Sequence, residues 1–486
     1  MDEAQSTADR ALTISSDPRV RADILLENET IASRRANRAA QESALAALRA
    51  LAESLGDPEL QRIILLRRIE FALNVSDTAT LETAIRELKA CTPHDDAHWI
   101  GKLHIADAKL AFLLGRLAES NAAAQAALEC ARASNNSAAA AEALCSLATV
   151  EAHRGNLSEA EALFDEAARA TDDPVLEDLS IASAFQIAYN RRDLERCLTL
   201  GQRWLDLAEA SGDRRSEARA HSHLGIALSA AGAQYAQARE HIAYAVRFFT
   251  EVGDVSGTAA QLLNQAVIEA RLGFFDKAVA ATERAVTLFE SLNDGRGRAI
   301  GLGNLGLFRA YTTDVEGAQK AAREAVALAR QLEFGVIEAS SLENLAFAGA
   351  AAGDLTEAIA HAEAALEVRA RSQSEGWASK TLADLAVWHA ASGNLRAAGD
   401  YMRRMLADEK SILASSGPEY CYWAAAQIFH LESKTPEAAR ALARARQMIA
   451  ATADGLDPAD RASFESIPWN SDVAAAARGA WPDPPR

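Results

Sequence analysis

Proline, aromatic residues and cysteine are all scarce in this sequence of 486 residues. It has 11 prolines, and Phe, Trp and Tyr together make up 6% of the chain. Because alanine supplies much of the apolar share and little proline interrupts it, we expect an all-helical protein. The cysteines are odd in number and form no CxxC pair, which argues against a disulfide framework and predicts free thiols in a reducing compartment. They are Cys91, Cys130, Cys145, Cys197 and Cys421.

The chain also has no long apolar run and no excess of positive charge. Its first residues, MDEAQSTADRALTISSD, lack the basic and apolar regions of a signal peptide, and no stretch approaches 18 uninterrupted apolar residues. We therefore predict a cytoplasmic protein that does not enter a membrane. The net charge of −18 makes direct nucleic-acid binding by this chain unfavourable, since such binding rests on neutralising phosphates.

Motifs that carry catalysis are missing. The sequence has no GxxxxGK[ST] phosphate loop, no GxGxxG after a strand, and no helix-turn-helix at its C-terminus. The stretch HDDAHWIGKLH at 94–104 resembles a metal site, but Pro93, Asp95 and Asp96 predict a loop and a helix N-cap there. We predict a protein that is not an enzyme and that holds neither a metal nor a cofactor.

What the sequence does contain is an internal repeat of about 40 residues. Four segments align, at 271–294, 312–334, 351–374 and 391–410, and each has a turn followed five residues later by an alanine. Those alanines are Ala278, Ala318, Ala358 and Ala398. A helix that ends at a Gly-Asp or Gly-Asn turn and a second helix with small residues on one face predict an antiparallel pair. One such pair cannot bury both apolar stripes, so neighbouring pairs must stack.

This pattern resembles the tetratricopeptide repeat (TPR), which places Leu-Gly in its first helix and Ala twice in its second. The corresponding stretches here are HLG at 223–225, NLG at 304–306, NLA at 344–346 and DLA at 384–386. The longer period resembles the superhelical sensor regions of bacterial MalT-like regulators and signal-transduction ATPases, and also the Pins-type spindle adaptors. The resemblance implies a right-handed α-solenoid, a TPR superhelix of about eleven helix-turn-helix repeats. We expect repeats to start near 18, 58, 97, 137, 175, 214, 255, 295, 335, 375 and 416.

The ends of the chain depart from the repeat. Residues 1–17 are predicted to form a partial N-terminal helix or cap, as if the chain were cut from a longer protein or began with an atypical cap. Residues 18–455 form the superhelix. Residues 456–486 resemble the closing segment of the same bacterial sensor regions, with Ser463, Phe464, Pro468 and Asn470 at its motif positions. We expect a capping helix there, in which Phe464 and Trp469 cover the apolar end, followed by a mobile tail.

A row of polar residues runs along the first helices and marks a candidate binding face. Each member is followed three residues later by an apolar residue on the same side of the helix. Larger side chains stand seven residues after two of them, at Arg271 and Tyr311. The predicted concave-face residues are His223, Asn264, Arg271, Asn304, Leu307, Tyr311, Asn344, Phe347 and Asp384. In TPR proteins that bind extended segments, an asparagine before Leu-Gly forms such a ladder. An Asn amide both donates and accepts, so it suits a peptide backbone. Alternatively, these asparagines only bond the neighbouring repeat and set the superhelical pitch.

The function predicted from these features is a non-catalytic scaffold that binds a protein or an extended peptide in its groove. By resemblance, it would be the sensor or partner-binding part of a bacterial signal-transduction or transcriptional regulator. One alternative is a superhelix that senses a small, sugar-like inducer, for which only Tyr311 and Phe347 offer aromatic platforms. Another is an accessory domain of an ATPase or nucleotide cyclase whose catalytic part is absent from this chain.

Overall fold

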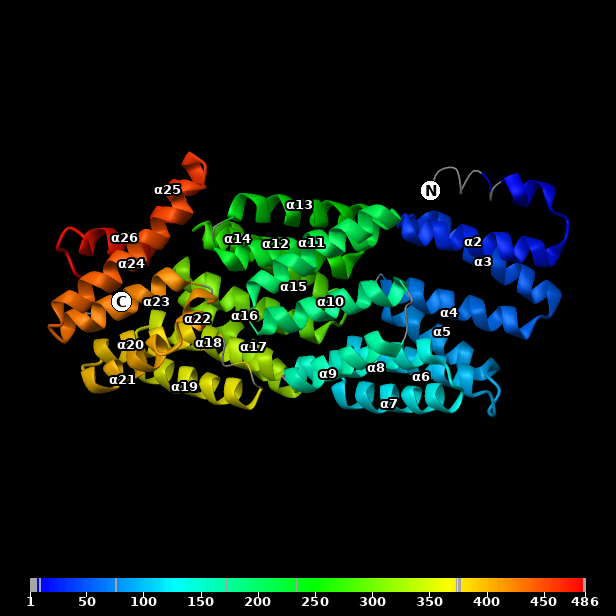
Figure 1. Cartoon of the computed structure of the whole chain (residues 1–486), viewed down its shortest axis with the longest axis horizontal. Coiled ribbons are helices and arrows are strands. Elements are labelled where there is room, and N and C mark those ends of the chain that lie inside the picture. The colour runs from blue at the N-terminus through cyan, green and yellow to red at the C-terminus, as the bar shows by residue number, and fades with distance from the viewer. Residues whose placement is uncertain are drawn as a thin grey trace.

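The computed structural model describes residues 7, 10–74, 77–154, 156–170, 174–191, 193–232, 234–372, 374, 377–415 and 417–483, with the side chains of 174–180 and 190 left out. These residues form helices joined by short turns (Figure 1). Eleven antiparallel helix pairs follow one another along the chain. The first helices of the pairs are α2 (Pro18–Arg34), α4 (Pro58–Asn74), α6 (Ala97–Leu113), α8 (Ser137–Arg154), α10 (Pro174–Asn190), α12 (Arg214–Ala231), α14 (Val255–Arg271), α16 (Gly295–Tyr311), α18 (Gly335–Ala351), α20 (Ser379–Ala391) and α23 (Pro418–Leu431).

The second helix of each pair returns antiparallel to the first. These helices are α3 (Arg38–Leu55), α5 (Thr78–Cys91), α7 (Leu117–Ala133), α9 (Leu157–Ala170), α11 (Leu194–Ser211), α13 (Tyr235–Glu251), α15 (Phe275–Ser291), α17 (Val315–Gln331), α19 (Leu355–Arg371), α21 (Leu395–Leu406) and α24 (Thr435–Asp454). The predicted all-α solenoid of about eleven helix-turn-helix repeats is thus confirmed. Two late repeats start a few residues after the expected 375 and 416. Residues 372–378 lengthen one connection, and the short helix α22 (Glu409–Leu413) is inserted in another.

Local chemistry explains where these helices begin and end. At the turn before α19, Gly353 adopts a left-handed φ of 84°, and the Asp354 carboxylate then accepts a hydrogen bond from the Glu357 amide at 2.9 Å. Glycine reaches this conformation without the Cβ penalty of other residues, and aspartate satisfies an unpaired amide of the first helical turn. The predicted cap at Asp96 is also present, since its side chain accepts from the amides of His98 and Trp99.

Small residues allow the two helices of a pair to approach closely. The four alanines of the repeat, Ala278, Ala318, Ala358 and Ala398, are all completely buried. Larger apolar residues fill the space between successive pairs, in a set of cores that continues from one repeat to the next. This is the stacking that the repeat predicts, because one pair alone would leave an apolar face in water.

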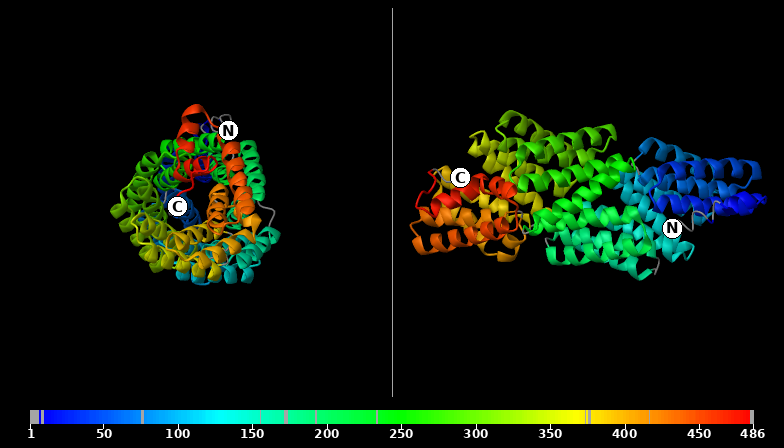
Figure 2. Two further views of the ribbon diagram at one scale, coloured as in Figure 1. Left: turned by 90° about the vertical axis from the view of Figure 1, so that its left-hand side faces the viewer. Right: turned by 90° about the horizontal axis from the view of Figure 1, so that it is seen from above.

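The pairs wind into a superhelix whose successive turns touch (Figure 1, Figure 2). Thr452 in α24 donates to the carbonyl of Gly232 at 3.0 Å, although 220 positions separate them. A Cβ placed on Gly335 would lie 3.6 Å from the carbonyl oxygen of Arg154. Each of these contacts joins a repeat to the one five places later, so about five repeats complete one turn. Seen along its axis, the chain forms a ring of helices around a central space (Figure 2).

The C-terminal segment packs back onto the solenoid. Helices α25 (Pro458–Glu465) and α26 (Pro468–Ala476) both contact α24, and α26 also contacts α23. Buried Asn470 donates to the carbonyl of Phe464 at 2.8 Å, which fixes the bend between the two helices. Further on, Trp481 stacks on His430 with ring centroids 4.1 Å apart. The end of the predicted mobile tail, 484–486, lies outside the described residues.

At the other end, residues 10–14 are helical, while 1–6, 8 and 9 of the predicted partial helix lie outside the described part of the chain. Among the helices that the structure describes, none has the length and apolar character to cross a membrane.

Candidate ligand-binding cavity

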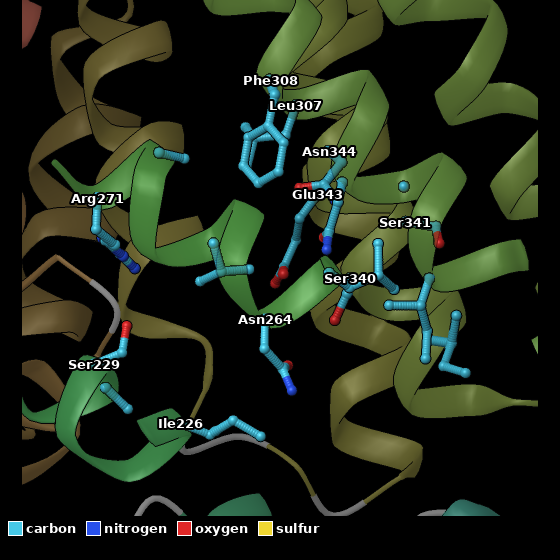
Figure 3. Close-up of a pocket in the computed structure, with 18 of the residues that line it drawn as sticks. Ile226, Ser229, Asn264, Arg271, Leu307, Phe308, Ser340, Ser341, Glu343 and Asn344 are labelled. Carbon is cyan, nitrogen blue, oxygen red and sulfur yellow. The ribbon is translucent and has the colours of Figure 1, made fainter. Parts of the chain in front are cut away.

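A cavity of about 600 Å³ lies on the inner side of the superhelix, lined by five successive first helices, α12 to α20. Figure 3 shows lining residues from the first four of these helices. Because five repeats make one turn, the wall is closed by residues from repeats that are distant in sequence. Tyr189 of α10 meets Trp377, which precedes α20, with ring centroids 5.4 Å apart. The volume falls within the range of ligand-binding pockets.

The structure brings eight of the nine predicted site residues to this cavity. They are Asn264, Arg271, Asn304, Leu307, Tyr311, Asn344, Phe347 and Asp384. The ninth, His223, lies outside it. Its ring packs against Phe185 and Trp204 at centroid distances of 4.6 and 4.8 Å, and its Nδ1 donates to the Arg219 carbonyl. The large rings of the preceding repeat hold His223 in the wall between α10 and α12.

The three asparagines have different surroundings. The Asn264 amide donates to Gln261 Oε1 at 3.1 Å and lies 3.5 Å from Ser222 Oγ, so it is tied to its own helix and to the repeat before. In contrast, the side chains of Asn304 and Asn344 form no hydrogen bond with any residue that the structure describes. Both are half-buried and line the cavity. Two successive first helices therefore present amides with open donors and acceptors to one space.

An aromatic row crosses one end of the cavity. The Tyr311 ring stacks on Phe275 at 4.4 Å, and Phe347 lies on its other side at 4.7 Å. Trp469 of α26 approaches Tyr311 edge-on at 6.0 Å, so this residue of the C-terminal segment helps to line the cavity. Burial raises the pKa of Tyr311 to about 12, and its hydroxyl remains protonated at neutral pH. The row is therefore an apolar group of packed rings with one neutral hydroxyl.

Asp384 is already neutralised by its neighbours. Lys380 Nζ donates to one of its oxygens at 2.8 Å and the Tyr420 hydroxyl to the other at 2.7 Å. Burial lowers the pKa of Lys380, but the charge and hydrogen bond of Asp384, together with Tyr311 and Glu343, raise it above the ordinary value. The Lys380 ammonium also lies 5.3 Å from the centre of the Phe347 ring. An unpaired carboxylate at this position could attract a basic partner, but here this chain itself supplies the cation.

A second charged network lies next to this pair and joins α18 to α20. Buried Arg369 donates from Nε and Nη2 to the two carboxylate oxygens of Glu343, at 2.6 and 2.5 Å. Thr381 donates to the same carboxylate at 2.5 Å, which ties α18 to α20. Bidentate pairs of this kind fix geometry as well as charge. Glu343 extends into the cavity beside Asn344 (Figure 3) with its charge balanced.

Several lining residues were missed by the sequence argument, namely Phe275, Arg296, Glu343, Trp377, Lys380 and Trp469. Glu343 precedes Asn344 by one residue, and Lys380 precedes Asp384 by four. Helical periodicity in these first helices therefore contained a signal for both. Phe275 and Trp469 come from a second helix and from the C-terminal segment. Only the superhelical winding brings them to the inner face.

Comparison with known proteins finds distant structural similarities. No family profile matches the sequence, and no curated protein matches it either. Among solved structures, a Rap protein complexed with competence and sporulation factor is 11% identical, with a TM-score of 0.45 over 81% of this chain and 99% of that one. The anaphase-promoting complex assembly Cut9–Hcn1 is 13% identical, with a TM-score of 0.45 over 95% and 92%.

A third structure is that of a signal-transduction ATPase with a tetratricopeptide repeat sensor from Pyrococcus horikoshii. It is 14% identical, with a TM-score of 0.35 over 77% of this chain and 52% of that one. Similarities this distant carry no argument about function. The fold class follows from the repeats themselves, which form an α-solenoid of helix-turn-helix units and confirm the resemblance to the TPR superfamily.

Proposed function

We propose that this chain is a TPR scaffold that binds an extended segment of a partner protein in its inner cavity. The observation that carries the proposal is the pair of cavity-facing amides on α16 and α18, Asn304 and Asn344, which have no hydrogen-bond partner in the described part of the chain. A peptide backbone repeats a donor and an acceptor at each residue, which is the chemistry that an amide side chain complements.

The spacing of the helices suits such a ligand. Neighbouring packed helices lie about 8–10 Å apart, while an extended chain advances about 3.3 Å per residue, so successive amides would meet roughly every third peptide unit. Asn264 would add a third contact through its Oδ1 acceptor, since its Nδ2 is held by Gln261. The aromatic row of Phe275, Tyr311 and Phe347 would then hold an apolar side chain of the partner.

The test is the double variant Asn304→Ala/Asn344→Ala, with Asn121→Ala on α7 as the matched control outside the cavity. Binding of pooled random five-residue peptides is measured by equilibrium dialysis and mass spectrometry. Two lost hydrogen bonds, each contributing about 0.5–1.5 kcal/mol, should weaken retention roughly tenfold to a hundredfold. If retention stays at the level of the control while the thermal midpoint drops, the asparagines are structural and the proposal is refuted.

A small-molecule sensor is the second candidate, and the aromatic row favours it. Phe275, Tyr311 and Phe347 pack against one another in a cavity of suitable size, so a sugar-like ring would find an apolar aromatic group to contact there. Titration with a panel of oligosaccharides, followed by tryptophan fluorescence from Trp469 at the end of the row, separates the two candidates. Saturable quenching by a sugar, without retention of any peptide, would favour the sensor.

The biological setting that we propose is the sensor or partner-binding part of a bacterial signal-transduction or transcriptional regulator. An accessory role beside an ATPase or nucleotide cyclase is the alternative. The support is the repeat period of about 40 residues and the motif around Phe464 and Asn470. Sequencing the gene and its neighbours tests it: if neither the same reading frame nor an adjacent gene encodes a phosphate-loop ATPase, a cyclase or a DNA-binding domain, this setting is wrong.

A further inference from the structure

Positive charge accumulates in the cavity although the chain as a whole is strongly acidic. The lining contains four basic residues and three acidic ones, a difference of +1, whereas the whole chain carries −18. The basic residues are Arg271, Arg296, Arg369 and Lys380, and the acidic ones are Asp294, Glu343 and Asp384.

Most of these charges are already paired within the chain. Lys380 bonds Asp384 and Arg369 bonds Glu343, so these four groups contribute little net charge. Asp294 accepts a hydrogen bond from the amide of Gly297 at 2.8 Å, as the N-cap of α16. Outside these pairs lie the guanidinium groups of Arg271 and Arg296 and the carboxylate of Asp294, which acts on Arg296, so the net excess is one positive charge.

Arg271 is the better placed of the two for a ligand. It lies at the C-terminal end of α14, and in the described part of the chain its side chain forms neither a hydrogen bond nor an ion pair (Figure 3). The nearest competing acid is Glu419. That carboxylate feels the charge of Arg271 but forms no ion pair with it, and burial raises the pKa of Glu419. An arginine with its donors open can bind a carboxylate or phosphate through two parallel hydrogen bonds.

Arg296 marks a second position farther along the wall. Its guanidinium lies over the Phe112 ring at 5.9 Å, and its buried Nε has no hydrogen-bond partner among the described residues. Burial lowers the pKa of Arg296, and the charge of Asp294 only partly restores it. An anion near this site would relieve a buried charge that Asp294 compensates only in part, which is costly in a low-dielectric interior.

We infer that the cavity selects an acidic peptide, with Arg271 bonding a carboxylate of the ligand beside the aromatic row. This inference rests on the proposed peptide-binding function and specifies its ligand. Asn304 and Asn344 hold the backbone, the row takes an apolar side chain, and Arg271 supplies the charge preference. Asp384 and Glu343 are each paired with a cation of this chain, so neither carboxylate is open to a basic peptide.

The experiment uses the full chain and four pools of five-residue peptides. In three pools, blocked at both ends, the central residue is Glu, Gln or Lys and the other positions are random. In the fourth, the central residue is Gln and the C-terminal carboxylate is free, which separates side-chain from terminal carboxylates as the source of charge. We expect the Glu pool or the free-acid pool to be retained about tenfold better than the blocked Gln pool, as for one charge-assisted hydrogen bond.

Two variants with opposite expected effects test the residue assignment. Arg271→Gln should abolish the preference for acid, while Glu419→Gln, which removes the competing carboxylate, should increase it. Arg309→Gln is the control, because Arg309 pairs with Glu283 outside the cavity. If all pools are retained equally, or if Arg271→Gln keeps the preference, this inference is wrong while peptide binding stands. If no pool is retained at all, the proposed function itself fails.

Discussion

Replacing Gly306 by alanine tests whether close helix contact in the repeat determines stability. Gly306 is the glycine of the NLG stretch, buried in α16 where this helix crosses α17. A Cβ placed there would lie 2.8 Å from the Ala322 Cβ and 3.0 Å from the Ala318 carbonyl oxygen. Distances this short force the helices apart, because one of the opposing atoms is backbone. Overpacking of this kind costs about 1–3 kcal/mol.

The opposing term is helix propensity, which favours alanine over glycine by about 1 kcal/mol. We therefore expect Gly306→Ala to destabilise the α16–α17 contact by about 1 kcal/mol net. The matched control is Gly349→Ala on α18, where the new Cβ would meet its nearest atom at 3.6 Å, an ordinary contact. That change should stabilise its helix by up to about 1 kcal/mol, so the two variants should differ by about 2 kcal/mol.

Native-state hydrogen exchange of α16 and α17 is the assay, because stability in a repeat protein is local and a single unfolding transition would blur it. Opening free energies in these two helices should fall in Gly306→Ala and stay unchanged in Gly349→Ala. Equal or greater protection in Gly306→Ala would refute the reasoning. It would mean that α17 shifts at no cost and that the glycine is not required by packing.

Two further predictions concern contacts between superhelical turns. Burial, and then the charge of Arg296, lower the pKa of His153 to about 3, against about 6.5 in an unfolded chain. Between these two pKa values the unfolded state binds more protons than the folded state. The contribution of neutral His153 to the free energy of unfolding is therefore complete above pH 6.5 and decreases as pH falls, by about 2 kcal/mol at pH 5. His153→Gln should flatten the pH dependence of the thermal midpoint between pH 7 and 5, and the control His94→Gln, at an exposed histidine, should not. The same slope in both variants would show that His153 is not the source of this pH dependence. The second prediction concerns Arg239, which donates to both carboxylate oxygens of buried Asp460 at 2.9 and 3.2 Å. Arg239→Gln should speed amide exchange in α25 and leave exchange in the distant helix α4 unchanged. Unaltered exchange in α25 would show that this contact contributes little.

Features that depend on local chemistry could be predicted from the sequence. The repeat starts follow from glycine and aspartate at the turns, as at Gly353 and Asp354, since each residue acts on its own backbone. The row from Asn264 to Asp384 follows from helical periodicity within each first helix and from the constant repeat length. Both signals are contained in a few consecutive residues, so no knowledge of the superhelix is needed.

Features that depend on winding could not be predicted in this way. The rotation from one repeat to the next is small, but over five repeats it decides that Tyr189 meets Trp377 and that Arg239 meets Asp460. The total rotation over five repeats cannot be read from any short stretch of sequence. His223 shows the reverse case: its place in the row is regular, yet Phe185 and Trp204 of the preceding repeat cover its ring and keep it out of the cavity.

The contacts between turns also bear on how the cavity would respond to a ligand. Trp469 belongs to α26, which follows directly after α25, and α25 is fastened to the middle of the chain by Asp460 and Arg239. The ring centroid of Tyr311 in α16 lies 6.0 Å from that of Trp469. A ligand on the aromatic row would therefore touch two turns of the superhelix at once. A ligand that contacts both turns stabilises the contacts between them. An occupied cavity should therefore slow amide exchange in α25 as well as in α16, although no ligand atom would reach α25.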